Sequence, residues 1–304
     1  MRNAFSSALV VAAKSDPRIL LLTGDHGYAL FDEFRKACPD QYINAGVAEQ
    51  NMVGVAAGLA KGGFRPFVYG LSAFVPIRVL EQIKLDVCYE QLPVVFIGDG
   101  AGVVYSSLGS SHQSTEDIAA LRAIPNITIL SPADHYEMTQ CINLALTSDR
   151  PVYLRMGKAD LQTVHESLPD FQVGDLCHIK QGANKMCFIA TGSMVSTAIT
   201  VSKEFDDVSV WSAPCIKPLN IDKVIDIARS HELIVTLEEH SIYGGLGSAI
   251  AEITSEYSPI KVHRIGIKDR FSKFCGSYQY LIEEHHLDFE SILNTVTALE
   301  TKHL

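Results

Sequence analysis

The stretch NAGVAEQNMVGVAAGLA, residues 44–60, decides how the chain is expected to fold. Its first residues are small, as at the end of a strand, and its second half is an Ala- and Gly-rich apolar run that predicts a helix over 51–61. Glu49 stands at the junction, where the helix dipole stabilises a carboxylate. The apolar helix would also remove this carboxylate from water, as happens in many functional sites. Local pattern alone leaves both interpretations open, a helix-start charge and a functional acid.

Short runs of Val, Ile and Leu alternate with longer helical stretches along the chain. Such alternation predicts a parallel sheet with crossover helices. The expected strands cover residues 19–22, 66–69, 94–97, 127–130 and 152–154, and then 186–190, 208–211, 233–236 and 262–265. The expected helices cover 51–61, 72–89, 135–146, 195–205, 222–230 and 244–257. The polar segment 161–184 is predicted to link two sequential α/β domains, 1–160 and 185–304.

The composition is that of an ordinary globular chain. Of the 304 residues, 47% are apolar and 20% charged, which excludes a disordered or collagen-like chain. Lys and Arg number 25 against 35 Asp and Glu, and the net charge of −10 argues against nucleic acid or an anionic membrane as partner. Seven cysteines without a CxxC pair predict reduced thiols, and no apolar run approaches the roughly 18 residues of a membrane span. We therefore expect a cytoplasmic protein without a metal site of its own.

The segment around Glu49 resembles the pyrimidine-binding segment of the transketolase family. The similarity continues in order through residues 62–67, 80–83, 109–113, 237–241 and 244–248. It covers essentially the whole chain, and several linked motifs in order are far more specific than any one. The chain is thus similar to the C-terminal subunit of a split, two-chain transketolase. The resemblance implies a thiamine diphosphate (ThDP) pyrimidine-binding fold followed by a fold like the transketolase C-terminal domain.

The resemblance also implies which residues hold the cofactor. In the family, a glutamate at the place of Glu49 pairs with the aminopyrimidine of ThDP and promotes the tautomer that acts as base at the thiazolium carbon. Phe74 falls where the family places an aromatic ring against the pyrimidine, whereas Leu71 replaces a neighbouring family aromatic. Asp25, in Thr23-Gly24-Asp25-His26-Gly27, resembles a family carboxylate near the cofactor and the interface. A turn Asp at a strand end is the alternative interpretation.

His112 and Arg155 are the expected substrate residues. Ser111-His112-Gln113 matches the family's active-site histidine loop, so His112 is expected to be catalytic and to contact a substrate hydroxyl. Arg155 matches an arginine that binds the acceptor phosphate. Leu108 and Gly100 depart from the pattern, because sugar-phosphate transketolases carry an Asp and a His there. A phosphorylated acceptor and a differently held one both stay open.

The tripeptide Gly98-Asp99-Gly100 resembles the start of the metal and diphosphate motif of ThDP enzymes. In that motif the Asp and a later Asn-Asn pair hold Mg²⁺ through oxygen ligands. The sequence contains no Asn-Asn, so the tripeptide is interpreted as a βα turn. The resemblance implies that a separate N-terminal transketolase subunit holds the diphosphate and Mg²⁺ (or Ca²⁺). It further implies a two-plus-two heterotetramer built on a homodimer of this chain, which would be inactive alone.

The main hypothesis is transfer of a two-carbon ketol unit from a ketose donor to an aldose acceptor. The beta subunit of a 2-oxo acid dehydrogenase decarboxylating component and a 1-deoxyxylulose-5-phosphate synthase-like enzyme share this architecture and are alternatives. A non-catalytic regulatory or scaffold paralogue is another. The second domain adds little chemistry, since Glu238, Glu239 and His240 at a strand end predict structural or dimer contacts.

Overall fold

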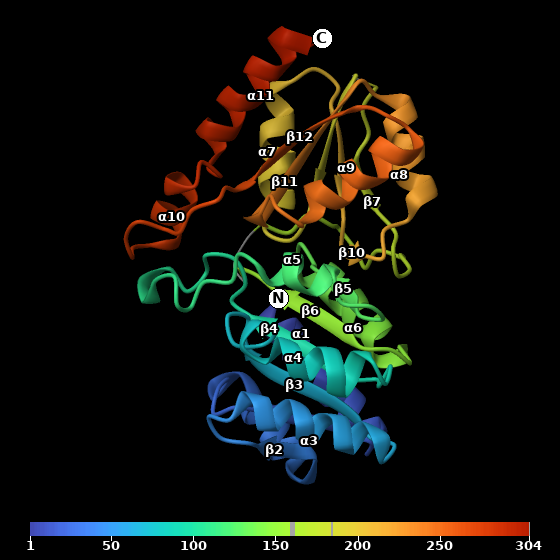
Figure 1. Ribbon diagram of the computed structural model, residues 1–304, viewed down its shortest axis with the longest axis vertical. Helices are drawn as coiled ribbons and strands as arrows, with labels where there is room; N and C mark the ends of the chain where they lie inside the picture. The colour runs from blue at the N-terminus through green and yellow to red at the C-terminus, as the bar shows by residue number, and fades with distance from the viewer. Residues whose placement is uncertain (159–161, 184, 304) are drawn as a thin grey trace.

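The computed structural model describes residues 1–158, 162–183 and 185–303. These residues form two α/β domains stacked along the long axis of the molecule (Figure 1), which confirms the predicted fold class. The predicted boundaries at residues 160, 161 and 184 lie outside the described residues. No helix in the described ranges is both long and apolar enough to cross a membrane.

Within the described residues, the first sheet has seven strands in the order β10-β5-β6-β4-β3-β1-β2. Its parallel strands are β1 (Ile19–Thr23), β2 (Tyr42–Asn44), β3 (Arg65–Leu71), β4 (Val95–Asp99), β5 (Thr128–Leu130) and β6 (Val152–Met156). Every residue of β1 is buried. Leu20 and Leu22 pack on one face of the sheet and Leu21 on the other, as expected where helices cover both faces of a parallel sheet.

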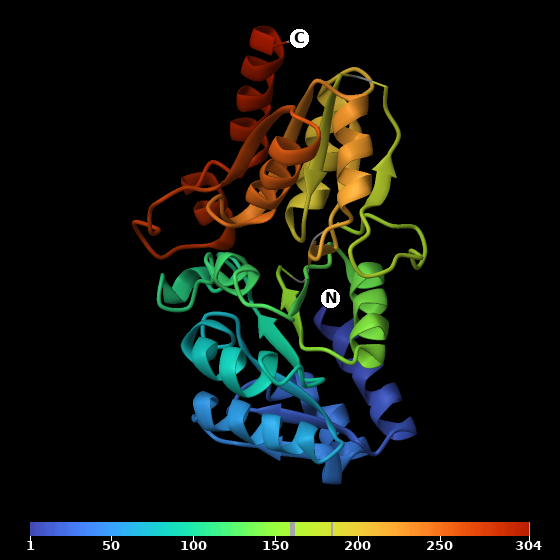
Figure 2. The ribbon, with the colours of Figure 1, turned by 45° about the vertical axis from the view of Figure 1, so that its right-hand side comes forward.

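Helices cover the first sheet from two sides. They are α1 (Arg2–Ser15), α2 (Asp32–Ala37), α3 (Glu49–Lys61), α4 (Leu80–Gln82), α5 (Asp117–Arg122) and α6 (His135–Thr147). The first, second and sixth share one core, and Figure 2 shows α1 and α6 side by side. The third and fifth belong to the core on the opposite face. The sheet is therefore closed to water on both faces and open only at its ends.

The second domain has a five-stranded sheet, in the part of the chain described, with the order β12-β11-β8-β9-β7. The strands are β7 (Cys177–Lys180), β8 (Met186–Ala190), β9 (Ser209–Ser212), β11 (Leu233–Ser241) and β12 (Lys261–Ile267). The helices are α7 (Met194–Val201), α8 (Ile221–Ser230), α9 (Leu246–Tyr257), α10 (Tyr278–Glu284) and α11 (Phe289–His303). The eighth and ninth helices cover one face, and α11 runs beside α7 on the other (Figure 1).

The structure differs from the sequence-based expectation in several places. The helix predicted over 72–89 starts only after Pro76, because proline lacks an amide hydrogen and restricts the residue before it. Part of the predicted linker is strand β7, which pairs antiparallel with β9. Strand β10 (Cys215–Lys217), from the second half of the chain, pairs antiparallel with β5 and completes the first sheet.

The carboxyl ends of the parallel strands meet at one edge of the first sheet. The loops after β1, β2, β3 and β4 therefore bring together residues 24–28, 45–49, 72–78 and 100–116. This is the edge at which open α/β sheets bind their ligands.

Candidate active site

Glu49 is the first residue of α3 and lies just past the end of β2. Only 4% of its surface is exposed. Its Oε1 accepts a hydrogen bond of 3.0 Å from Nη1 of Arg78. Gly24, just after β1, lies beside it: a Cβ there would make an ordinary van der Waals contact with Cγ of Glu49, at 3.8 Å. The sequence-based expectation of a buried carboxylate at this junction is confirmed.

Phe74 lies at the centre of a cluster of side chains from three loops. Its ring centre is 5.3 Å from that of His112, in an edge-to-face arrangement, and 6.1 Å from that of His26. The guanidinium carbon of Arg78 lies 4.0 Å from the ring centre. Because Arg78 also bonds Glu49, the cluster joins the three residues Glu49, Phe74 and His112 that the sequence singled out. Arg78 and His26 are members that sequence reasoning missed.

His112 is held by the long loop between β4 and α5. Its backbone N–H donates to the carbonyl of Gly109 over 3.0 Å, and Nδ1 lies 3.0 Å from Oγ of Ser111. The next residue, Gln113, accepts a 2.8 Å hydrogen bond from Ser272 of the second domain. The second domain thus fixes the loop that carries His112.

Asp25 sits at the same edge in a left-handed turn with φ of 63°. Its backbone N–H donates to Oδ1 of Asn44, and its Oδ1 accepts from Nδ2 of Asn44, both over 3.2 Å. Hydrogen bonds from Tyr28 and Asn44 lower the pKa of Asp25. Next to it, His26 has a buried Nε2 without a hydrogen-bond partner in the described part of the chain. The geometry supports the turn interpretation of Asp25 and places it near the cluster.

Arg155 lies away from this cluster, in the junction between the domains. It is 3% exposed, and its Nε donates to Oδ2 of Asp117 over 2.8 Å. Its Nη2 donates to the carbonyl of Glu239 over 3.0 Å. Burial alone would lower the pKa of Arg155, but Asp117, Tyr153 and Glu239 together outweigh it and raise that pKa. Protein acceptors bind Nε and Nη2 of the guanidinium, which indicates a structural role; the predicted contact of Arg155 to an acceptor phosphate stays a prediction.

Glu239 fastens the second domain to the first. Its Oε1 accepts from the backbone N–H of Val103 over 2.9 Å, in the loop that carries His112. Its Oε2 accepts from the hydroxyl of Tyr278 over 2.6 Å and from the hydroxyl of Ser193. Burial, reinforced by Glu239, raises the pKa of Tyr278. Of the structural and dimer contacts that the sequence predicts for this segment, these bonds within the chain are structural.

Asp99 of the Gly-Asp-Gly tripeptide ends β4 and is 2% exposed. It accepts from the hydroxyls of Tyr69 and Tyr105, over 2.6 and 3.2 Å, and pairs with Arg2 at 3.3 Å. Three protein groups therefore hold this carboxylate, in agreement with its interpretation as part of a βα turn.

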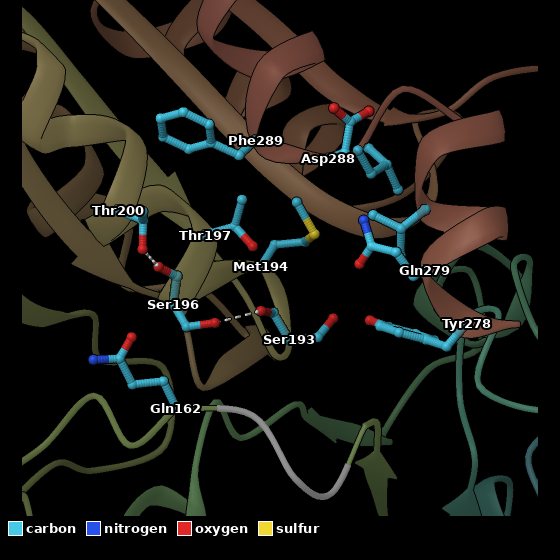
Figure 3. A pocket seen from close by; sticks show the side chains of 12 residues that line it. Gln162, Ser193, Met194, Ser196, Thr197, Thr200, Tyr278, Gln279, Asp288 and Phe289 are labelled. Carbon is cyan, nitrogen blue, oxygen red and sulfur yellow. Dashed lines mark hydrogen bonds between the residues drawn. The ribbon is translucent and has the colours of Figure 1, made fainter.

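A separate hollow lies in the second domain between α7 and α10 (Figure 3). Much of its polar lining is bound within the domain: Ser196 donates to the carbonyl of Ser193, and Thr200 to that of Ser196. Asp288 caps α11 by accepting from the N–H of Ser291. The chemistry-bearing groups Glu49, Phe74 and His112 lie instead on the first domain, and we take their edge as the candidate site.

Fold and site together define an α/β enzyme domain whose polar groups gather at the carboxyl edge of a parallel sheet, followed by a second α/β domain. Family comparison narrows this class. The transketolase pyrimidine binding domain matches residues 1–163, and the transketolase C-terminal domain matches residues 176–292. The chain therefore belongs to the transketolase family.

Individual relatives show which part of a transketolase the chain corresponds to. A subunit of the apulose-4-phosphate transketolase of Phocaeicola vulgatus is 34% identical, covering 98% of this chain and 96% of the relative. A 1-deoxy-D-xylulose-5-phosphate synthase of Caldanaerobacter subterraneus is also 34% identical, but the match covers 48% of its length. A solved split-gene transketolase, an inactive β4 tetramer, superposes with a TM-score of 0.88 at 32% identity, over 98% of this chain and 96% of that one. The chain corresponds to the C-terminal subunit of a split transketolase.

Proposed function

We propose that this chain supplies the pyrimidine side of the ThDP site in a two-chain transketolase, which transfers a two-carbon ketol unit from a ketose donor to an aldose acceptor. The observation that carries the proposal is the meeting of Glu49, Phe74 and His112 at one edge of the first sheet. An aminopyrimidine needs a carboxyl group as hydrogen-bond partner and a flat apolar surface. Glu49 and Phe74 provide these two groups side by side, so the residues fit the cofactor.

Each residue of the cluster has a task in this proposal. When bound, ThDP supplies a carbanion that attacks the carbonyl of the donor sugar. The buried carboxyl of Glu49 would hold a proton against the pyrimidine nitrogen, away from water. The ring of Phe74 would orient the pyrimidine, and His112 would bond a substrate hydroxyl and move its proton. Asp25 would keep the turn after β1 in place beside them.

The diphosphate and its cation, Mg²⁺ or Ca²⁺, are proposed to come from an N-terminal transketolase subunit. The sequence has no Asn-Asn pair, and Asp99 is already held by protein groups. The apulose-4-phosphate relative is itself one subunit of a transketolase, and the solved relative made of β chains alone is inactive. These points support a need for a second subunit. For the assembly we propose a two-plus-two heterotetramer with a homodimer of this chain, located in the cytoplasm.

The test is to co-express the chain with the N-terminal transketolase half and purify the complex. With ThDP and Mg²⁺, the complex is offered a ketose phosphate or pyruvate together with a panel of aldehydes. We expect ketol transfer from the ketose only when both subunits are present. If the two chains form no complex and no turnover is detected, the result would favour a non-catalytic scaffold.

The relative that is a 1-deoxy-D-xylulose-5-phosphate synthase favours one second candidate, a decarboxylating reaction on pyruvate. The same assay separates the two candidates. Release of CO₂ from pyruvate without ketol transfer would move the chain to that synthase class or to the beta subunits of 2-oxo acid dehydrogenases.

A further inference from the structure

Arg78 makes the two contacts that the proposed function assigns to the pyrimidine. It lies in the turn Ile77–Val79 after β3. One nitrogen of its guanidinium bonds Glu49 over 3.0 Å, and the same planar group lies over the ring of Phe74, 4.0 Å from its centre. The two histidines of the cluster stay farther from this ring, at 5.3 and 6.1 Å. Arg78 is therefore the planar group nearest the face of Phe74 among these neighbours.

A guanidinium and an aminopyrimidine can each occupy the position over Phe74 and beside Glu49. Both are planar, both donate N–H groups to a carboxylate, and both stack on an aromatic face. Glu49 is 5% exposed at its side chain, so the buried carboxylate has little room for two planar partners at once. One of the two must leave when the other binds.

The surroundings of Arg78 allow it to leave. Its side chain is 46% exposed, in contrast to 3% for Arg155. An ion pair with one member half in water contributes little to folding, because solvent screens the attraction and the long side chain gains freedom on release. Arg78 can turn toward water while Glu49 and Phe74 stay in place.

We propose that Arg78 is a gate residue of the pyrimidine site, which competes with the pyrimidine of ThDP for Glu49 and Phe74 and swings outward when the cofactor binds. This rests on the proposed function, because that function defines the competitor. Arg78 is a positioning residue: it holds Glu49 and covers Phe74 until the pyrimidine replaces it. Removing it makes pyrimidine binding tighter, the opposite of what loss of a binding residue would do.

Calorimetric titration of the full-length chain with 4-amino-5-hydroxymethyl-2-methylpyrimidine, the pyrimidine half of ThDP, tests the gate. Arg78→Met keeps the length of the side chain and removes the planar cation. We expect it to bind the probe about tenfold more tightly than the original chain. The matched control is Arg18→Met, which removes a 67% exposed arginine paired with Asp16 on the same domain and is expected to change nothing.

Chemical rescue tests the gate in a second way, because an added guanidinium would change probe binding only if Arg78 occupies the pyrimidine site. Methylguanidinium chloride at tens of millimolar should occupy the place that Arg78→Met opens and weaken the binding of the probe to that variant. An equal concentration of sodium chloride should not. Arg78→Lys, which keeps the charge but not the planar group, should bind with intermediate affinity and serves as a second variant if Arg78→Met fails to fold.

The outcomes separate the gate from the proposed function. If Arg78→Met binds the probe no more tightly than the original chain, or not at all, the gate is overturned. The site assignment stands in that case provided that Glu49→Gln still weakens binding or abolishes ketol transfer by the complex. If Glu49→Gln changes neither probe binding nor ketol transfer, the proposed function itself fails.

Discussion

Two arginine–carboxylate pairs on the first domain differ in how far they are exposed to water. In the pair Arg78–Glu49, 46% of the arginine side chain is exposed. In the pair Arg155–Asp117, the exposed fractions are 3% and 0%, and Asp117 also accepts from Tyr153 over 2.8 Å. The same chemistry thus gives an exchangeable contact at the open edge of the sheet and a fixed one at the domain junction. Exposure of the cation, rather than the identity of the residues, separates a binding site from a structural joint.

The largest effect, a loss of activity, should come from a change of Glu49, the carboxylate of the half-exposed pair Arg78–Glu49. Glu49→Gln keeps the shape of the side chain but removes the acid, so the complex should lose roughly 10²–10⁴-fold in kcat. The melting temperature should stay within a few degrees, because a half-exposed ion pair contributes little. Steady-state kinetics and a thermal melt check both parts. Near-original activity would refute the catalytic assignment of Glu49.

For the buried pair Arg155–Asp117 we expect the reverse: the main effect should be on stability. Arg155→Met leaves Asp117 buried without its cation, which should cost about 3–5 kcal/mol and lower the melting temperature by about 10 °C. The double variant Arg155→Met/Asp117→Leu should recover much of this loss, because no unpaired charge stays buried. Thermal unfolding of both variants is the measurement. If Arg155→Met were as stable as the original chain, the buried pair would not have the structural role that the comparison gives it.

Glu239 should show a smaller effect at the same junction. Glu239→Gln replaces one acceptor oxygen by an NH₂ group; with this group in the place of Oε2, the hydroxyls of Tyr278 and Ser193 must both turn around, at a cost of about 1–2 kcal/mol. Hydrogen exchange at the amide of Val103 should speed up, since this amide donates to Glu239. Unchanged exchange would show that Glu239 does not fix the loop that carries His112.

The smallest effect concerns His165, whose Nε2 lies 2.8 Å from Oε1 of Glu137. Burial alone would lower the pKa of His165, but the hydrogen bond and charge of Glu137 outweigh it and raise that pKa above 6.5. The pair therefore stabilises the fold fully below about pH 6.5 and loses this contribution as pH rises through the raised pKa. The difference in unfolding free energy between the original chain and His165→Gln should shrink, by up to about 1 kcal/mol, from pH 6 to pH 9. A constant difference over this range would contradict the pairing.

The sequence predicted the central strands well, because their Val, Ile and Leu runs are buried on both faces of the sheet. It missed β2, which is three residues long, and β10, whose partner β5 lies far away in the chain. It singled out Glu49, Phe74 and His112 as candidates because linked motifs resemble a family. It missed Arg78 and the contact of Arg155 with Asp117, since an arginine's role follows from the carboxylate it meets, 29 residues away in one case and 38 in the other.

Strand β10 has a consequence for building chimaeras. It crosses from the second half of the chain to cover the outer edge of β5, and Lys217 at its end donates to the carbonyl of Arg122 over 3.0 Å. An exchange of C-terminal domains between relatives would therefore replace one strand of the first sheet as well. A fragment cut after residue 158 would present an unpaired edge of β5, a surface on which other chains can add strands. A crossover after residue 217 would keep β10 with β5, but it would separate β7, β8 and β9 from β11 and β12 in the second sheet, so no single crossover point leaves both sheets with one parent.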